Sequence, residues 1–166
     1  MIVRTLLLLR HAKSDYPAGE PDRDRPLAPR GERDADAAGA WLAAAYPRID
    51  EVVVSPALRA QHTWARVASR VQASTVRTDP RVYDDWGSAL RDVMAGLSDD
   101  ASIALLVGHN PGIEEFAAAL GEGGDPSARA RLRTKYPTSG IAVLLVPGSW
   151  ADPGAVELAA FAVPRG

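Results

Sequence analysis

Short runs of apolar residues, each bounded by polar or turn-forming residues, recur along the chain. Runs of this length are typical of strands that are buried on both faces of a sheet. They predict five strands, at residues 2–9, 51–54, 103–107, 141–146 and 156–163.

Apolar residues spaced three or four apart lie between these runs and predict helices that bury one face. The stripes fall within residues 35–45, 60–71, 90–97 and 113–120. For the last helix, Asn110 is the expected N-cap, Pro111 suits the first turn, and Gly121 ends it.

Strands that alternate with helices predict an α/β fold, a three-layer α/β/α sandwich with a mostly parallel central sheet. Residues 147–154 are too few for a crossover helix, so the last two strands should form an antiparallel hairpin at one edge. Residues 121–126 are expected to be a flexible loop. Residues 13–30 form a long polar loop, and such loops are usually functional or mobile. Its conformation is left open.

The 166 residues suit a single domain spanning residues 1–166. The chain has no cysteine, which excludes disulfides, Cys-based metal sites and a thiol nucleophile. A net charge of −2 argues against a nucleic-acid partner.

Neither a signal peptide nor a membrane span is indicated, so a cytoplasmic protein without a membrane partner is expected. Trp86 and Trp150 are expected at the surface, too few to define an interface, and the oligomeric state stays open.

Two of the three histidines, His11 and His109, directly follow predicted buried strands. Ligands of open α/β sheets bind beyond the carboxyl ends of the strands, where both imidazoles would meet. Each residue alone also fits a strand-end histidine satisfied by backbone hydrogen bonds. Two at equivalent positions, with an arginine beside one, favour a functional site.

Two arginines are placed where an anion would stabilise them. Arg10 ends a buried strand, where an unpaired charge is costly. Arg59 begins a predicted helix, where its charge opposes the helix dipole unless an anion binds, although it also fits a surface position. Two arginines and two histidines match the oxygens of a phosphoryl group in transfer, with no need for a metal or cofactor. One neutral histidine could act as the nucleophile.

Several motifs extend this interpretation. Residues 9–14 (Leu-Arg-His-Ala-Lys-Ser) resemble the signature of the histidine phosphatase superfamily, or phosphoglycerate-mutase-like fold, in its SixA-type phosphohistidine phosphatase branch. Residues 22–27, 30–31, 55–60, 82–83, 108–112 and 137–140 resemble further motifs of that branch, in order.

The resemblance implies roles for individual residues. His11 would attack phosphorus and form a phosphohistidine intermediate, while Arg10, Arg59 and His109 hold the phosphoryl oxygens. Arg25 would be an additional phosphate-facing arginine. Ser14 would lie at the substrate edge, and Asn110 would cap a turn.

Two departures from the family pattern matter. His62 stands where relatives commonly have glutamine; it could face the edge of the site or be solvated, and we expect it to be solvated. Asp84 and Asp85 are the only candidates by position for a general acid, and they equally suit a helix N-cap. The SixA-type branch is thought to need no strong acid, because a phosphoramidate can leave as neutral imidazole.

Three functions follow from these observations. The first is a phosphohydrolase that acts on a phosphohistidine protein. The second is a phosphomonoesterase that acts on a small phosphorylated metabolite or nucleotide. The third is a phosphate-binding module without catalysis. A dinucleotide-binding domain is disfavoured, because no glycine-rich fingerprint follows the first strand.

Overall fold

The computed structural model describes residues 2–83 and 87–166. Its strands are β1 (Arg4–Arg10), β2 (Arg48–Val54), β3 (Gln72–Thr78), β4 (Ile103–Gly108), β5 (Gly123–Gly124), β6 (Ile141–Val146) and β7 (Glu157–Ala162). Its α-helices are α1 (Pro29–Ala45), α2 (Leu58–Ala68), α3 (Gly87–Ala95), α4 (Gly112–Leu120) and α5 (Pro126–Thr134).

The described strands form one sheet in the order β3-β2-β4-β1-β6-β7-β5. Strand β1 pairs in parallel with β4 and antiparallel with β6. The mostly parallel sheet and the β6–β7 hairpin confirm the predicted fold class. The hairpin lies one strand inside the edge, because the two-residue strand β5 pairs with β7. Strand β5 and its turn occupy the segment expected to be a flexible loop.

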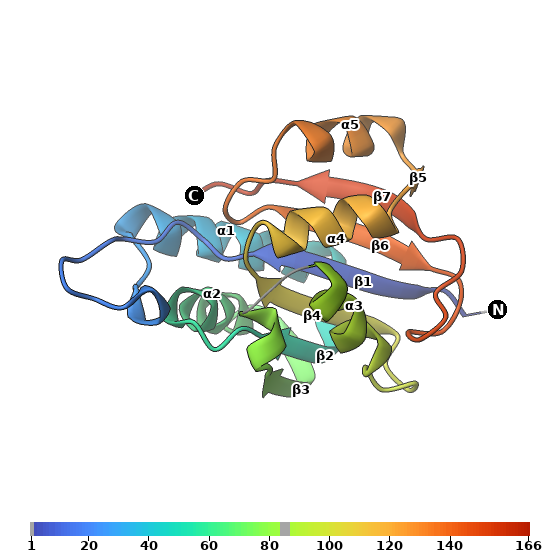
Figure 1. The fold of residues 1–166 in the computed structure, drawn as a ribbon, viewed down its shortest axis with the longest axis horizontal. Helices are drawn as coiled ribbons and strands as arrows, with labels where there is room; N and C mark the ends of the chain where they lie inside the picture. The colour runs from blue at the N-terminus through green and yellow to red at the C-terminus, as the bar shows by residue number, and fades with distance from the viewer. Residues whose placement is uncertain (1, 84–86) are drawn as a thin grey trace.

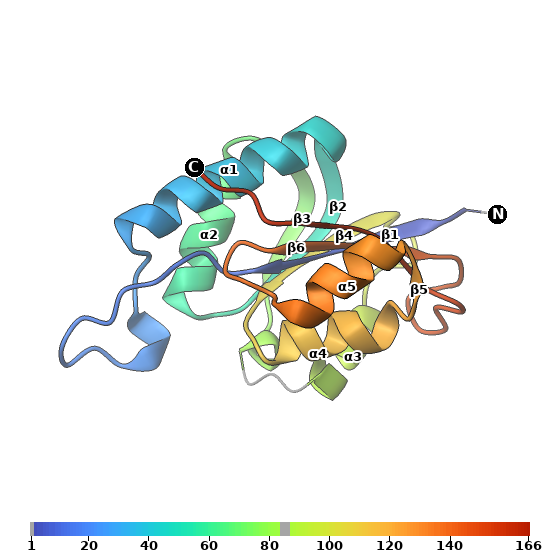
Figure 2. The ribbon, with the colours of Figure 1, turned by 90° about the horizontal axis from the view of Figure 1, so that it is seen from above.

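Helices cover both faces of the sheet, as Figures 1 and 2 show, with α1 and α2 on one face and α3, α4 and α5 on the other. Strand β1 explains how one sequence supplies both cores. Leu6 and Leu8 pack into the core under α3, α4 and α5, while Leu7 and Leu9 pack under α1 and α2. All four leucines are fully buried, as expected for a central strand covered on both sides.

Sequence patterns missed β3 and α5 because neither carries a regular apolar stripe. Most residues of β3 are exposed at the sheet edge, and only Ala128 and Leu132 of α5 are buried. The prediction that Trp150 is exposed was wrong: its ring is buried, and its Nε1 donates to the carbonyl of Ala101 at 3.1 Å. Trp86 lies outside the described residues.

The carboxyl ends of the parallel strands β1, β2 and β4 lie together on one side of the sheet. Arg10 pairs with Gly108, and Val54 pairs with Val107. The loops after these three strands therefore meet there. Within the described residues, no helix is long and apolar enough to span a membrane.

Candidate active site

His11 is held in one tautomer at the end of β1. Its Nδ1 lies 2.8 Å from the carbonyl oxygen of Ala12, which can only accept, so Nδ1 carries the proton. Nε2 then carries the lone pair and accepts from Nε of Arg59 at 3.3 Å. Thr63 fixes this arrangement because its hydroxyl accepts from the Ala12 amide at 3.0 Å and donates to the Arg59 carbonyl at 2.7 Å.

His109 is held in a matching way at the end of β4. The Ser55 hydroxyl accepts from the Ala57 amide at 3.2 Å and lies 2.7 Å from Nε2 of His109. One hydrogen bond joins the hydroxyl and Nε2, and its direction depends on which ring nitrogen of His109 carries the proton. Nδ1 is buried and has no hydrogen-bond partner among residues 2–83 and 87–166. The two imidazole centroids are 5.0 Å apart, as expected from the adjacent strand ends.

Both imidazoles are neutral at physiological pH. Burial is the largest cause that lowers the pKa of His11 well below 6.5, and His109 and the two arginines add to it. Burial and the Arg59 guanidinium lower the pKa of His109 to about 3. His11 therefore has the unprotonated nitrogen that a nucleophile needs.

Acidification below pH 6.5 is expected to destabilise the fold. The histidines of the unfolded chain bind protons in this range, whereas His11 and His109 stay unprotonated in the folded protein. Each such histidine lowers the free energy of unfolding by about 1.4 kcal/mol per pH unit between its unfolded and folded pKa. Urea unfolding at pH 7 and pH 5 measures this slope. The free energy of unfolding of His109→Gln should fall less between pH 7 and pH 5 than that of wild type. That of His62→Gln, at an exposed position, should fall as much as that of wild type. Equal slopes for His109→Gln and wild type would contradict the assignment.

Arg10 extends into the same site from the last position of β1. Its Nη1 donates to the carbonyl of Tyr136 at 2.9 Å, while its buried Nε has no partner within the described chain. Desolvation lowers the pKa of Arg10, opposed by the charge of Glu114, and the residue stays protonated. Arg10 thus offers an unused charged donor.

Arg59 lies in the first turn of α2, as the sequence predicts, and is 7% exposed, which excludes the surface alternative. Its Nη1 donates to the backbone carbonyl of Asp22 at 2.8 Å, and its Nη2 pairs with the Asp22 carboxylate at 3.2 Å. The guanidinium plane is thereby fixed with Nε toward His11.

Residues 13–28 fold over the site rather than away from it. Gly31 permits this path, because a Cβ there would collide with the carbonyl of Lys13. Ser14 pairs with Leu27 across the segment, and the hydroxyl of Ser14 accepts from Nη2 of Arg25. The guanidinium of Arg25 also lies 3.7 Å from the ring centroid of Tyr16. The structure thus brings Arg25 and Ser14 to the histidines.

These side chains enclose a cavity of about 220 Å³, lined by Arg10, His11, Lys13, Ser14, Tyr16, Arg25, Arg59, His109, Asn110 and Thr138. Among the described residues, the lining is cationic and polar and contains no carboxylate. The arrangement suits a phosphoryl group, since arginine forks and imidazole N–H groups bind its oxygens.

Three other sequence expectations have different outcomes. His62 is exposed, as expected. The N-cap prediction for Asn110 was wrong: its amide nitrogen donates to Glu114 at 3.2 Å and to the Tyr136 carbonyl at 3.0 Å, and its Oδ1 accepts no hydrogen bond within the described residues. Asp84 and Asp85 lie outside the described residues.

Sequence reasoning missed the residues that orient the site, above all Ser55, Thr63, Asp22, Tyr83 and Tyr136. Ser55 and Thr63 stand in or beside the segment that carries Arg59, so position along the chain is a signal for them. Asp22 and Tyr83 lie within the motifs at residues 22–27 and 82–83, but those motifs gave neither residue a role, and Tyr136 lies in no motif.

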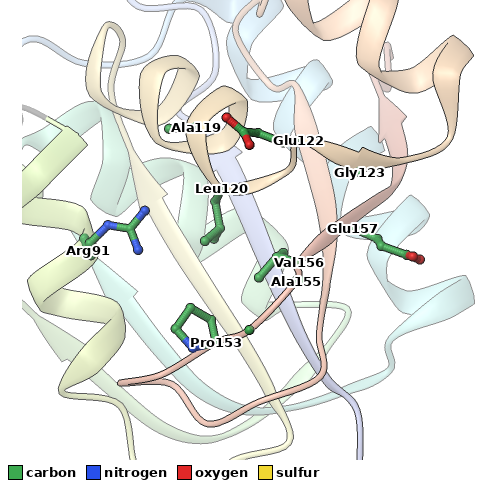
Figure 3. A pocket seen from close by; sticks show the side chains of 10 residues that line it. Arg91, Ala119, Leu120, Glu122, Gly123, Pro153, Ala155, Val156 and Glu157 are labelled. Carbon is green, nitrogen blue, oxygen red and sulfur yellow. The ribbon is translucent and has the colours of Figure 1, made fainter.

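A larger hollow of about 340 Å³ lies at the opposite end of the sheet, between α3, α4 and the start of β7 (Figure 3). Its lining mixes Arg91 with Glu122, Glu157 and apolar residues such as Leu120 and Val156. No histidine or second arginine lines it, so the phosphoryl-binding chemistry belongs to the smaller cavity. Over the described part of the chain, no cluster of three or more His, Asp or Glu side chains could hold a metal ion.

Comparison with known proteins agrees with this geometry. A family model described as "Histidine phosphatase superfamily (branch 1)" matches residues 6–123, a span that contains Arg10, His11, Arg59 and His109. An uncharacterized protein of Mycobacterium tuberculosis (strain ATCC 25618 / H37Rv) is 43% identical over 161 residues, covering 95% of this chain and 100% of the relative.

Solved structures extend the likeness to nearly the whole chain. A structure from Nakamurella multipartitia, assigned to the phosphohistidine phosphatases SixA, is 34% identical with a TM-score of 0.86, covering 99% of this chain and 98% of that one. The protein histidine phosphatase SixA complexed with tungstate is 22% identical with a TM-score of 0.79, covering 96% and 97%. At that identity the second structure supports the fold alone.

Proposed function

Since the chain belongs to the histidine phosphatase superfamily (branch 1), we propose that it is a metal-independent phosphatase that transfers a phosphoryl group first to His11 and then to water. The observation that carries this proposal is the orientation of His11. Its Nδ1 is bound to the Ala12 carbonyl, so the lone pair of Nε2 faces a cavity lined by arginines.

The reaction has two balanced steps. In the first, the lone pair of His11 Nε2 forms a bond to phosphorus, the bond to the leaving group breaks, and its electron pair stays on the leaving atom. In the second, a water oxygen attacks phosphorus, the His11–phosphorus bond breaks, and its electrons return to Nε2. The water proton passes to solvent or to the phosphate product.

Arg10, Arg59 and His109 would stabilise the charge that develops on the phosphoryl oxygens. Within the described residues, Arg10 Nε is a donor without a partner, and Arg59 Nε lies beside the attacking nitrogen. His109 Nδ1 is also buried without a partner there and can donate to a phosphoryl oxygen when it carries the ring proton. Donors fixed before the reaction stabilise the transition state without the cost of reorganisation. Arg25 and Ser14 would bind the substrate at the rim of the cavity.

We expect the substrate to be a phosphohistidine side chain of another protein. A phosphoramidate can leave as neutral imidazole and needs no strong acid, and none of the described residues that line the cavity is a carboxylic acid, Asp84 and Asp85 lying outside the described residues. A small phosphate monoester is the alternative substrate of the same site.

Rates of phosphate release from a phosphohistidine peptide, from p-nitrophenyl phosphate and from a sugar phosphate distinguish the two substrate classes. A higher kcat/KM for the monoesters would overturn the phosphohistidine assignment.

Chelation is expected to leave activity unchanged, because arginines supply the charge that a metal supplies in many phosphoryl-transfer enzymes. The measurement is the initial rate of phosphate release before and after dialysis against EDTA. Loss of activity on dialysis and its recovery on addition of Mg²⁺ or Mn²⁺ would contradict the proposal that arginines alone stabilise the charge on the phosphoryl group.

A further inference from the structure

Asp22 places a carboxylate beside the phosphoryl-binding cavity, in the short 3-10 turn Asp22–Asp24. Its Oδ1 accepts from Arg25 Nη1 at 2.9 Å, and its Oδ2 accepts from Arg59 Nη2 at 3.2 Å. The Tyr83 hydroxyl donates to the same Oδ2 at 2.8 Å. Asp22 therefore contacts both arginines that reach the site from outside β1.

The position is unexpected for a site that binds an anion. A fixed negative charge next to the arginines opposes a dianionic phosphate, because like charges repel strongly where water is partly excluded. Burial would raise the pKa of Asp22, but the Tyr83 hydroxyl and Arg59 outweigh it and hold this pKa below its ordinary value. The carboxylate is thus ionised at neutral pH.

The carboxylate is also open to a bound substrate. The side chain of Asp22 is 54% exposed, whereas those of Arg25 and Arg59 are 12% and 8% exposed. Glu114, another carboxylate near the site, lies behind Asn110 and does not line the cavity. Asp22 is not a lining residue either, but its carboxylate bonds directly to two lining residues, Arg25 and Arg59, and its exposed side lies at the rim of the cavity. Among the described residues, Asp22 is therefore the carboxylate that we expect a leaving group at the rim to approach.

We propose that Asp22 selects substrates by the charge of the leaving group, favouring a phosphoryl group carried on a protonated imidazole over one carried on an alkoxide oxygen. This inference rests on the proposed phosphatase activity. It assigns Asp22 a role in specificity, in addition to holding Arg59 and Arg25 in place.

The charge balance of the two reactions gives the reason. In a phosphohistidine with a protonated ring, the nitrogen–phosphorus bond breaks, its electrons stay on that nitrogen, and neutral imidazole leaves. The leaving ring is partly positive in the transition state, so a neighbouring carboxylate stabilises it. When an oxygen–phosphorus bond breaks, the leaving oxygen becomes negative, and the same carboxylate destabilises it. Both effects enter kcat/KM, which compares the transition state with free enzyme and free substrate.

The test compares Asp22→Asn with wild type on two peptides that differ only in carrying phosphohistidine or phosphoserine. The ratio of kcat/KM for phosphohistidine to that for phosphoserine should fall at least about tenfold in Asp22→Asn, since the amide keeps the shape but removes the charge. The inhibition constant of orthovanadate, an anion, should fall as well. Asp22→Glu, which keeps the charge, should retain a ratio closer to that of wild type.

Asp24→Asn is the matched control, because Asp24 is an exposed carboxylate of the same turn and its side chain makes no hydrogen bond or ion pair within the described residues. Its ratio should equal that of wild type. Circular dichroism and thermal melting check each fold, and Asp22→Ser is a second neutral variant if Asp22→Asn does not fold.

The outcomes separate the inference from the activity on which it rests. Equal losses on both peptides in Asp22→Asn would overturn the role in selectivity and leave Asp22 as a positioning residue only. A wild-type enzyme that hydrolyses neither peptide nor p-nitrophenyl phosphate would overturn the proposed phosphatase function together with this inference.

Discussion

Replacing His11 by alanine is expected to lower kcat by on the order of 10⁴-fold or more, because the variant has no atom to accept the phosphoryl group. The Ala12 carbonyl and Thr63 that orient His11 in wild type cannot supply a nucleophile in its place. The measurement is the rate of phosphate release under single-turnover conditions, which separates the chemical step from product release.

His62→Ala is the matched control for this loss, since His62 is an exposed histidine one turn beyond Arg59 and does not line the cavity. It should keep the wild-type rate. Melting temperatures of both variants verify that they fold. A His11→Ala variant that turns over at a rate close to wild type would show that another group, or water itself, attacks phosphorus.

Replacing Arg59 by lysine is expected to lower kcat/KM by about 10²–10³-fold although the charge is kept. The guanidinium uses Nη1 and Nη2 to hold Asp22 and directs Nε toward His11, and an ammonium cannot do all three at once. Transition-state donors act only when their direction is fixed in advance, so losing the planar fork should affect the chemical step more than the fold.

Arg66→Lys gives the comparison on the same helix. Arg66 is 41% exposed and pairs with Glu32 and Asp36, away from the cavity. Exposed ion pairs of this kind contribute little, so kcat/KM should stay within about twofold of wild type. An Arg59→Lys variant that is as active as Arg66→Lys would mean that charge alone is sufficient at position 59.

The elements that carry the strongest apolar patterns could be predicted from the sequence, as could the strand ends that hold His11 and His109. The run of four leucines in β1 predicts a strand buried on both faces, and alternate leucines do fill two separate cores. Strand β3 lacks such a signal because an edge strand buries few side chains. Helix α5 buries only two side chains, too few to produce a periodic stripe.

The contacts that orient the site could not be predicted, because they join residues far apart in the sequence. Asp22 meets Tyr83 across 61 positions, and Tyr136 binds Arg10 across 126. Local pattern also misjudged Asn110, whose side chain donates to the Tyr136 carbonyl rather than accepting at a helix start. The capping preference of asparagine predicts its role only where no tertiary contact engages the side chain.

Phosphohistidine at position 11 is the intermediate on which the proposed activity depends, and it can be trapped. Enzyme is mixed with a ³²P-labelled phosphohistidine peptide, quenched within milliseconds in alkaline detergent, and separated from the peptide by size. We expect label on the wild-type chain that is stable in base and lost in acid, and no label on His11→Ala. Release of labelled phosphate by wild type without any labelled protein at any time would contradict this intermediate, because water would then attack the substrate directly.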